Sequence, residues 1–274
     1  MDYETSSSSS LSSASNSMNH SFLSEMAEAP ARNIMWVLLL KLGLPSYLPY
    51  LLLGPSIQLI ATFLIYPYTP SSVLTSNSKR MKWRTTFIAR ISAAITGSWA
   101  ALVMMESSAI RSDLMFSSST SAIYLVVFSV GVHLAEAIDM LLYCKPSMLL
   151  LHHVMVIICF VGALITQKAI GFAVLSLVTE INAVFNKTRI LHIITGIASD
   201  SDTYKRNALV NVITFFIRIL IIGWMNNQCF FYLDVLPLSF LAPCIVGLGI
   251  VNVWNLSVFK TLLKKDILSK HKAI

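Results

Sequence analysis

The stretch that decides the fold is residues 149–189. It contains Leu149-Leu150-Leu151-His152-His153-Val154-Met155-Val156-Ile157-Ile158, followed later by Thr179-Glu180-Ile181-Asn182-Ala183-Val184-Phe185-Asn186-Lys187-Thr188-Arg189. A histidine pair and a glutamate thus occur in sequence that is apolar enough to lie in lipid. An ionisable side chain in a spanning helix is costly and almost always faces a cavity or a polar partner. A functional site is therefore expected here first.

The composition of the whole chain is that of an integral membrane protein. Of the 274 residues, 55% are hydrophobic and only 12% are charged, and the mean hydropathy is +0.71. Soluble domains carry about 25% charged residues. The net charge of +7 is interpreted as an orientation signal, because no basic cluster is interleaved with aromatic residues as in a nucleic-acid site. Nucleic acid is therefore not expected as a partner.

Seven apolar segments are long enough to be spanning helices, which need roughly 20 residues. They are residues 47–66, 87–105, 121–143, 147–165, 170–194, 208–225 and 236–259. The predicted fold is therefore an all-α polytopic membrane protein. The predicted organisation is a disordered, Ser-rich lumenal tail (1–30), a first transmembrane helix with a preceding interfacial segment (31–78), a six-helix domain (79–265) and a cytosolic basic tail (266–274).

The basic residues of the loops predict the orientation. One side of the membrane would hold 12 lysines and arginines and the other side 3. Because cytosolic loops are enriched in Lys and Arg, the C-terminus is expected in the cytosol and the N-terminus in the lumen. Lys270 and Lys272 stand fifth and third from the end of the sequence, which resembles the dilysine signal for retrieval to the endoplasmic reticulum. Coat machinery is then an expected partner, and the alternative is juxtamembrane charge that only fixes topology.

Helix 121–143 carries a polar stripe. His133, Glu136 and Asp139 are spaced i, i+3, i+6, so each lies next to the following one on the helix surface. Such a stripe is expensive in lipid unless it lines an interior. Asp139 is nearest the cytosolic end and can simply be hydrated.

The paired histidines point about 100° apart on their helix, so they cannot both face one direction. We expect one to face a cavity and the other to bond to a neighbouring helix. Histidine exchanges protons near neutral pH, which makes His152 and His153 candidate catalytic residues. The alternative is that both only hold helices together.

Further polar residues are candidates for the same cavity or its surroundings. Glu180 is expected to pair with other site residues, and Arg218 is a candidate partner of Glu180 or Glu136. Asn186 and Arg189 follow on the same helix, where Arg189 could meet an anionic head group or extend to the interface. The sequence predicts that Glu136, one of the paired histidines and Glu180 share one interior space.

The cysteines and the known short motifs suggest no metal and no cofactor. Cys144, Cys159, Cys229 and Cys244 are widely spaced, and apolar packing is their expected role. The sequence contains no glycine-rich phosphate loop and no His-Glu-x-x-His motif.

Several of these features together resemble the TLC-domain family, which includes the ceramide synthases. The matching features are Trp83 after a basic stretch, Gly131 to Glu136, the pair His152-His153, the run from Thr179 to Arg189, and Asn252-Val253-Trp254. The resemblance covers roughly residues 80–265 and implies a helical bundle or barrel around a lipid cavity.

The sequence also departs from the synthase pattern. Val132 replaces the family's tyrosine, Glu136 replaces its aspartate, and no histidine occurs near Ser92. Ceramide synthases follow the histidine pair with an aspartate-rich stretch, whereas no aspartate occurs here between His153 and Glu180. The chain is therefore more similar to the non-synthase branch, which is implicated in membrane lipid composition.

Three functions are considered. The first is binding, sensing or adjusting membrane lipid in the endoplasmic reticulum, with membrane lipids as partners. The second is an acyl-CoA-dependent N-acyltransferase, in which His152 or His153 acts as base and acyl-CoA is a substrate rather than a cofactor. The third is a seven-helix receptor. Against this function, Cys144 is expected on the cytosolic side and cannot reach Cys229 in a lumenal loop, so a receptor-like extracellular disulfide cannot form. The lipid and the oligomeric state are left open, with a homodimer as one option.

Overall fold

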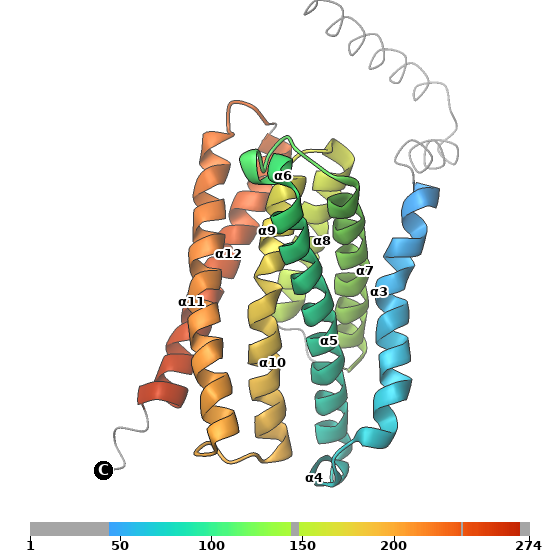
Figure 1. Cartoon of the computed structure of the whole chain (residues 1–274), viewed down its shortest axis with the longest axis vertical. Coiled ribbons are helices and arrows are strands. Elements are labelled where there is room, and N and C mark those ends of the chain that lie inside the picture. The colour runs from blue at the N-terminus through green and yellow to red at the C-terminus, as the bar shows by residue number, and fades with distance from the viewer. Residues whose placement is uncertain (1–43, 144–147, 237, 269–274) are drawn as a thin grey trace, which may run out of the picture. The chain divides into compact units, whose positions relative to one another are not determined.

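The computed structural model describes residues 44–143, 148–236 and 238–268, which form helices and no β-strand (Figure 1). The chain divides into a short unit, 1–48, and a main unit, 49–274, and the helix bundle belongs to the main unit. The predicted N-terminal tail, Cys144, Lys145, Lys270 and Lys272 lie outside the described residues.

The all-α prediction is confirmed, and the described residues contain seven helices that are long and apolar enough to cross a membrane. The elements are α3 (Leu44–Ile65), η1 (Tyr66–Tyr68), α4 (Ser71–Leu74), α5 (Asn77–Glu106), α6 (Ser108–Ser112), α7 (Thr120–Tyr143), α8 (Met148–Thr166), α9 (Ile170–Val178), α10 (Glu180–Thr195), α11 (Asp202–Phe231), α12 (Leu238–Leu262) and the π-helical turn η2 (Leu263–Ile267). Helices satisfy all of their backbone groups internally, which is what hydrocarbon requires.

Two helices begin well before their apolar runs. Helix α5 begins ten residues before the predicted start at residue 87 and includes the basic stretch from Lys79 to Arg84. Helix α11 begins at Asp202, six residues before its predicted start, and Ser201 caps it by accepting a hydrogen bond from Tyr204 N. Hydropathy marks the segment in lipid, whereas helical structure continues beyond it.

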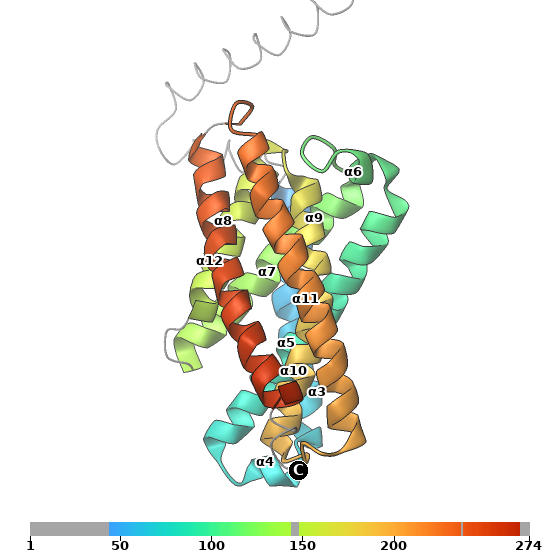
Figure 2. The same ribbon diagram turned by 90° about the vertical axis from the view of Figure 1, so that its left-hand side faces the viewer.

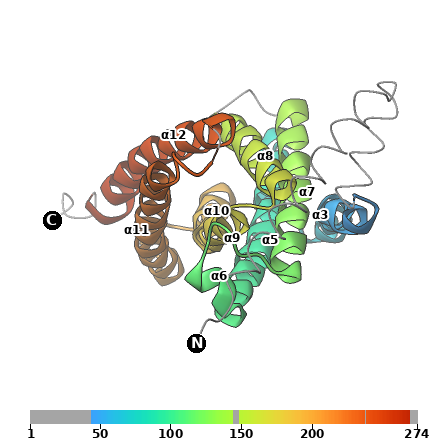
Figure 3. The ribbon, with the colours of Figure 1, turned by 90° about the horizontal axis from the view of Figure 1, so that it is seen from above.

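Helices α9 and α10 lie in the middle of the bundle when it is viewed from above (Figure 3). Helix α10 packs on α5 and α11, α7 packs on α8, and α12 packs on both α8 and α11. Figure 2 shows α11 and α12 side by side along most of their length. At Gly97 in α5, a Cβ atom would come within 2.9 Å of the Ile181 backbone nitrogen, so this close contact of α5 with α10 needs glycine.

The segment 170–194, predicted as one spanning helix, corresponds to one candidate span, Ile170–Thr195, which is divided at Thr179 into α9 and α10. Thr179 lies between Val178, the last residue of α9, and Glu180, the first residue of α10. Its φ and ψ are −68° and −12°. The Thr179 hydroxyl donates to the Ser176 carbonyl at 2.6 Å, which competes locally with the regular helical pattern. The interruption lies beside a large interior cavity.

A polar clamp joins the ends of three helices. Arg189 of α10 makes two hydrogen bonds to the carboxylate of Asp266 in η2, from Nε at 2.5 Å and from its terminal nitrogen at 2.9 Å. Tyr204 of α11 donates to the same carboxylate at 3.0 Å. The guanidinium of Arg189 is thus paired with a carboxylate of the chain itself, a partner that the sequence did not suggest. Asp266 is 4% exposed and is a partner that sequence reasoning missed.

Candidate functional site

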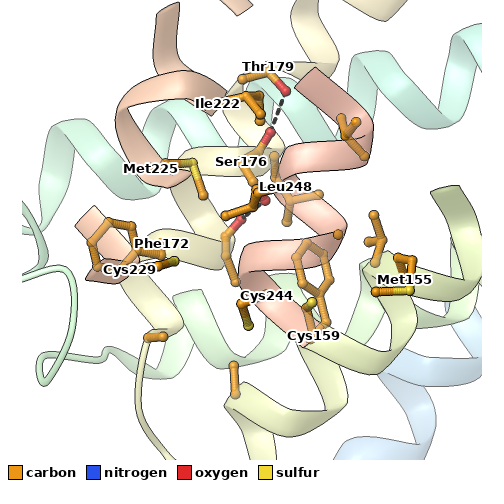
Figure 4. Close-up of a pocket in the computed structure, with 18 of the residues that line it drawn as sticks. Met155, Cys159, Phe172, Ser176, Thr179, Ile222, Met225, Cys229, Cys244 and Leu248 are labelled. Carbon is orange, nitrogen blue, oxygen red and sulfur yellow. Dashed lines mark hydrogen bonds between the residues drawn. The ribbon is translucent and has the colours of Figure 1, made fainter. Parts of the chain in front are cut away.

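A large cavity lies inside the bundle and is lined by residues of α7, α8, α9, α11 and α12, together with the α9–α10 junction. Its empty volume is about 1010 Å³, counting the part that opens to the outside. Much of the wall is made of aliphatic, aromatic and sulfur-containing side chains, which include Met155, Cys159, Phe172, Met225 and Leu248 (Figure 4). The wall is therefore apolar over most of its area.

Six polar residues contribute to the same wall and give the cavity a polar region: His133, His152, Ser176, Thr179, Glu180 and Arg218. His133 comes from α7 and His152 from α8, while Arg218 comes from α11. Thr179 and Glu180 lie at the junction of α9 and α10. Side chains that are far apart in the sequence thus meet at one cavity.

Arg218 and Glu180 form the ion pair of this region. Their closest nitrogen and oxygen atoms are 3.7 Å apart, and the side chains are 10% and 17% exposed. The same terminal nitrogen of Arg218 donates to the Thr179 carbonyl at 3.5 Å. Of the two partners that the sequence offered for Arg218, the structure brings Glu180 to it. The pair neutralises two charges that would each be costly alone in a membrane interior.

The two histidines of the pair face different surroundings. His152 lines the cavity, and its ring lies 6.3 Å from the Trp254 ring between centroids. Within the described part of the chain, His152 Nδ1 is buried without a hydrogen-bond partner. His153 is not among the lining residues and instead lies 3.1 Å from His133, measured between the two Nδ1 atoms. The 100° angle between neighbouring residues on a helix accounts for this division.

Glu136 contacts the other ring nitrogen of His153, Nε2. Its carboxylate is 3.5 Å from His153 Nε2, and Glu136 is not among the residues that line the cavity. His133, Glu136 and His153 form a compact group, in which one atom from each lies within 4.8 Å of the others. Glu136 therefore adjoins the cavity through the histidines rather than lining it, which differs from the expected arrangement.

Three other candidates from the sequence do not join the site. Asp139 is half-buried on α7, one turn beyond Glu136, and is not among the residues of the cavity wall. Asn186 is also half-buried and outside that wall. Arg189 belongs to the clamp with Asp266.

Sequence reasoning overlooked the three cavity cysteines as site residues. Cys159, Cys229 and Cys244 line the cavity, on α8, α11 and α12 respectively. All three are free thiols. Apolar packing, the role expected of them, agrees with a place in an apolar wall, but nothing in their spacing pointed to one shared cavity.

The chain is similar to known proteins over most of its length. A family model described as the TLC domain matches residues 82–264. TLC domain-containing protein 2 of Danio rerio is 30% identical over 198 residues, which are 71% of this chain and 80% of that protein. The mouse protein of the same name is 28% identical over 204 residues, which are 73% of this chain and 64% of that protein. Human TLC domain-containing protein 1 is 23% identical over 207 residues, which are 74% and 82% of the two chains.

Proposed function

Since the chain belongs to the TLC-domain family, we propose that it holds a membrane lipid in its interior cavity and so senses or adjusts membrane lipid composition. The observation that carries this proposal is one cavity with a largely apolar wall and a polar region of histidine, glutamate and arginine. An acyl chain fits the apolar wall, and a head group fits the polar residues.

The cellular setting of the proposal is the endoplasmic reticulum, with the C-terminus in the cytosol. The excess of basic residues on one side supports the orientation. Figure 1 is consistent with it, since the start of α5 and the α10–α11 connection lie at the same end of the bundle and α6 lies at the other end. The spacing of Lys270 and Lys272 supports retrieval by coat machinery.

Lipid occupancy of the cavity tests the proposal directly. Leu248 lines the cavity on α12, whereas Val253 on the same helix is 70% exposed and faces outward. We expect Leu248→Trp to reduce the lipid that copurifies with the protein, or that a photoactivatable fatty acid labels inside it, because the larger ring fills the space. Val253→Trp adds the same ring outside and should change neither. Equal lipid content and equal internal labelling in both variants would argue against a lipid in the cavity.

A second candidate is the acyl-CoA-dependent N-acyltransferase, and one observation favours it. His152 is the paired histidine that lines the cavity, and its Nδ1 has no partner in the described part of the chain. A buried imidazole with a free nitrogen can act as general base on an amine or alcohol. His153 is less suited, because it is already engaged with His133 and Glu136.

A lipidomic comparison of cells that express the wild type or His152→Asn separates the two functions. A change restricted to N-acylated lipids supports the transferase, whereas a broad shift in phospholipid acyl chains supports the regulator. His192→Asn is the matched control, since His192 lies on α10 and is not among the cavity residues. The seven-helix receptor, the third interpretation of the sequence, has no support from the family assignment.

A further inference from the structure

Behind the cavity wall, two histidines and a glutamate form a buried cluster. His133 and Glu136 occupy positions i and i+3 of α7, and His153 reaches them from α8. His133 is 5% exposed and His153 is 3% exposed, while the Glu136 side chain is 12% exposed. One nitrogen or oxygen atom from each residue lies within 4.8 Å of the other two. Three good metal ligands thus converge in a largely buried region.

Hydrogen bonds within the described part of the chain do not account for the whole cluster. His153 Nε2 is buried and lacks a hydrogen-bond partner there, and it stands 3.5 Å from the Glu136 carboxylate. That separation exceeds the 2.7–3.2 Å of an ordinary N–H···O bond. His153 is also the one ion-pair contact found for Glu136 among the described residues. A carboxylate with so weak a partner is costly inside a membrane.

The spacing fits a shared cation better. Zinc binds imidazole nitrogen and carboxylate oxygen at about 2.0–2.2 Å with tetrahedral geometry, which sets ligand atoms about 3.3 Å apart. Taken separately, the 3.1 Å between the Nδ1 atoms of His133 and His153 and the 3.5 Å between His153 Nε2 and the Glu136 carboxylate are each close to this value. They involve different nitrogens of His153, and an ion would take one of them. Since the three ligand atoms lie within 4.8 Å of one another, binding requires the group to contract by at most about 1.5 Å.

We propose that His133, Glu136 and His153 bind one divalent transition-metal ion, with Zn²⁺ as the best match to their donor atoms. Two imidazoles and one carboxylate form a common ligand set of zinc sites that keep a fourth position open. His133 belongs both to the cluster and to the cavity wall, so the ion lies at the edge of the cavity. Its open position is then available to a water molecule or to an oxygen of the cavity ligand.

The charges around the cluster bear on the fourth ligand. Arg218 balances Glu180. Glu136 then offsets only one of the two positive charges of the ion. The remaining positive charge favours an anionic oxygen in the open position. The site differs from the sequence-based expectation of no metal, and it does not depend on the lipid role proposed above.

Metal content of the purified protein tests the proposal. The full chain is purified in detergent through a tag without histidine, stripped with a chelator, loaded with Zn²⁺ and desalted. We expect about one zinc per chain by mass spectrometry of the metal. X-ray absorption at the zinc edge should show two imidazole ligands at about 2.0–2.1 Å. A chain that retains no zinc, or zinc without imidazole scattering, overturns the proposal even if no variant folds.

Variants locate the ion. Glu136→Gln and His133→Gln each remove one ligand with little change in size. Loss of an outer-shell partner already costs about 10–100-fold in metal affinity, so each variant should lose roughly 100-fold or more. His192→Gln is the matched control, because His192 lies outside the cluster, and it should bind zinc as the wild type does. Wild-type affinity in both cluster variants would place the zinc elsewhere and refute the site. Lipid copurification measured on the same samples shows separately whether the cavity ligand is present.

Discussion

Replacing Arg218 by methionine should destabilise the bundle through its effect on Glu180. The substitution leaves a carboxylate in the cavity wall without its partner, and it removes the hydrogen bond to the Thr179 carbonyl. Removing one member of a buried ion pair costs about 3–5 kcal/mol. The charged atoms here are 3.7 Å apart and border a cavity, so we expect a loss at or just below the lower end of that range, about 2–3 kcal/mol.

Thermal unfolding in detergent measures this effect, with the folded fraction that remains after heating determined by size-exclusion chromatography. A loss of 1 kcal/mol lowers Tm by about 2–4 °C in a domain of 150–250 residues, so Arg218→Met should unfold about 5–10 °C below the wild type. Glu180→Gln leaves the guanidinium unpaired and should also destabilise.

The double variant, with both charges removed, should lose less stability than the two single losses added together. The difference is the coupling energy of the pair. Strictly additive losses, or an Arg218→Met variant as stable as the wild type, would refute the ion-pair argument.

Four further outcomes are expected. Asp266→Asn should cost about 3 kcal/mol, because the bidentate arginine bond to a buried carboxylate is broken; an unchanged Tm would count against the clamp. Gly97→Val should cost about 1–3 kcal/mol by forcing α5 from Ile181, and wild-type stability would show that the contact yields. A C-terminal tag should be digested by protease added to sealed microsomes and an N-terminal tag protected; the reverse pattern would invert the topology. Changing Lys270 and Lys272 to Ser should release the protein to later compartments, and unaltered reticular staining would reduce the tail to a topology signal.

The spanning helices could be predicted from the sequence because hydropathy and length suffice for them. The seven predicted segments correspond to the seven spans. The division of labour between His152 and His153 also followed from helix geometry alone, although their roles stay predictions. What hydropathy could not supply was the interruption at Thr179, since hydropathy measures how apolar a segment is and not where its backbone departs from the regular helical pattern.

The pairing of distant charges was beyond the sequence for a different reason. Arg189 and Asp266 are separated by 77 positions, and Asp266 lies among lysines near the end of the chain. Charge patterning there predicts only a basic tail. Arg218 had two acidic candidates on other helices, and only the packing of α10 against α11 selects Glu180. The hydropathy of the sequence predicts where the helices lie along the chain. Which side chains of two neighbouring helices meet depends on how the helices pack.

The interruption at Thr179 makes part of the site insensitive to side-chain substitution. The group that accepts from Arg218 is the backbone carbonyl of Thr179, which every replacement at that position retains. An alanine scan would therefore score this contact as unimportant. The sensitive variable is residue count, because one residue inserted or deleted in α9 turns α10 by about 100° relative to it. Glu180 would then rotate away from Arg218, so length changes of one residue before this point should be far less tolerated than substitutions.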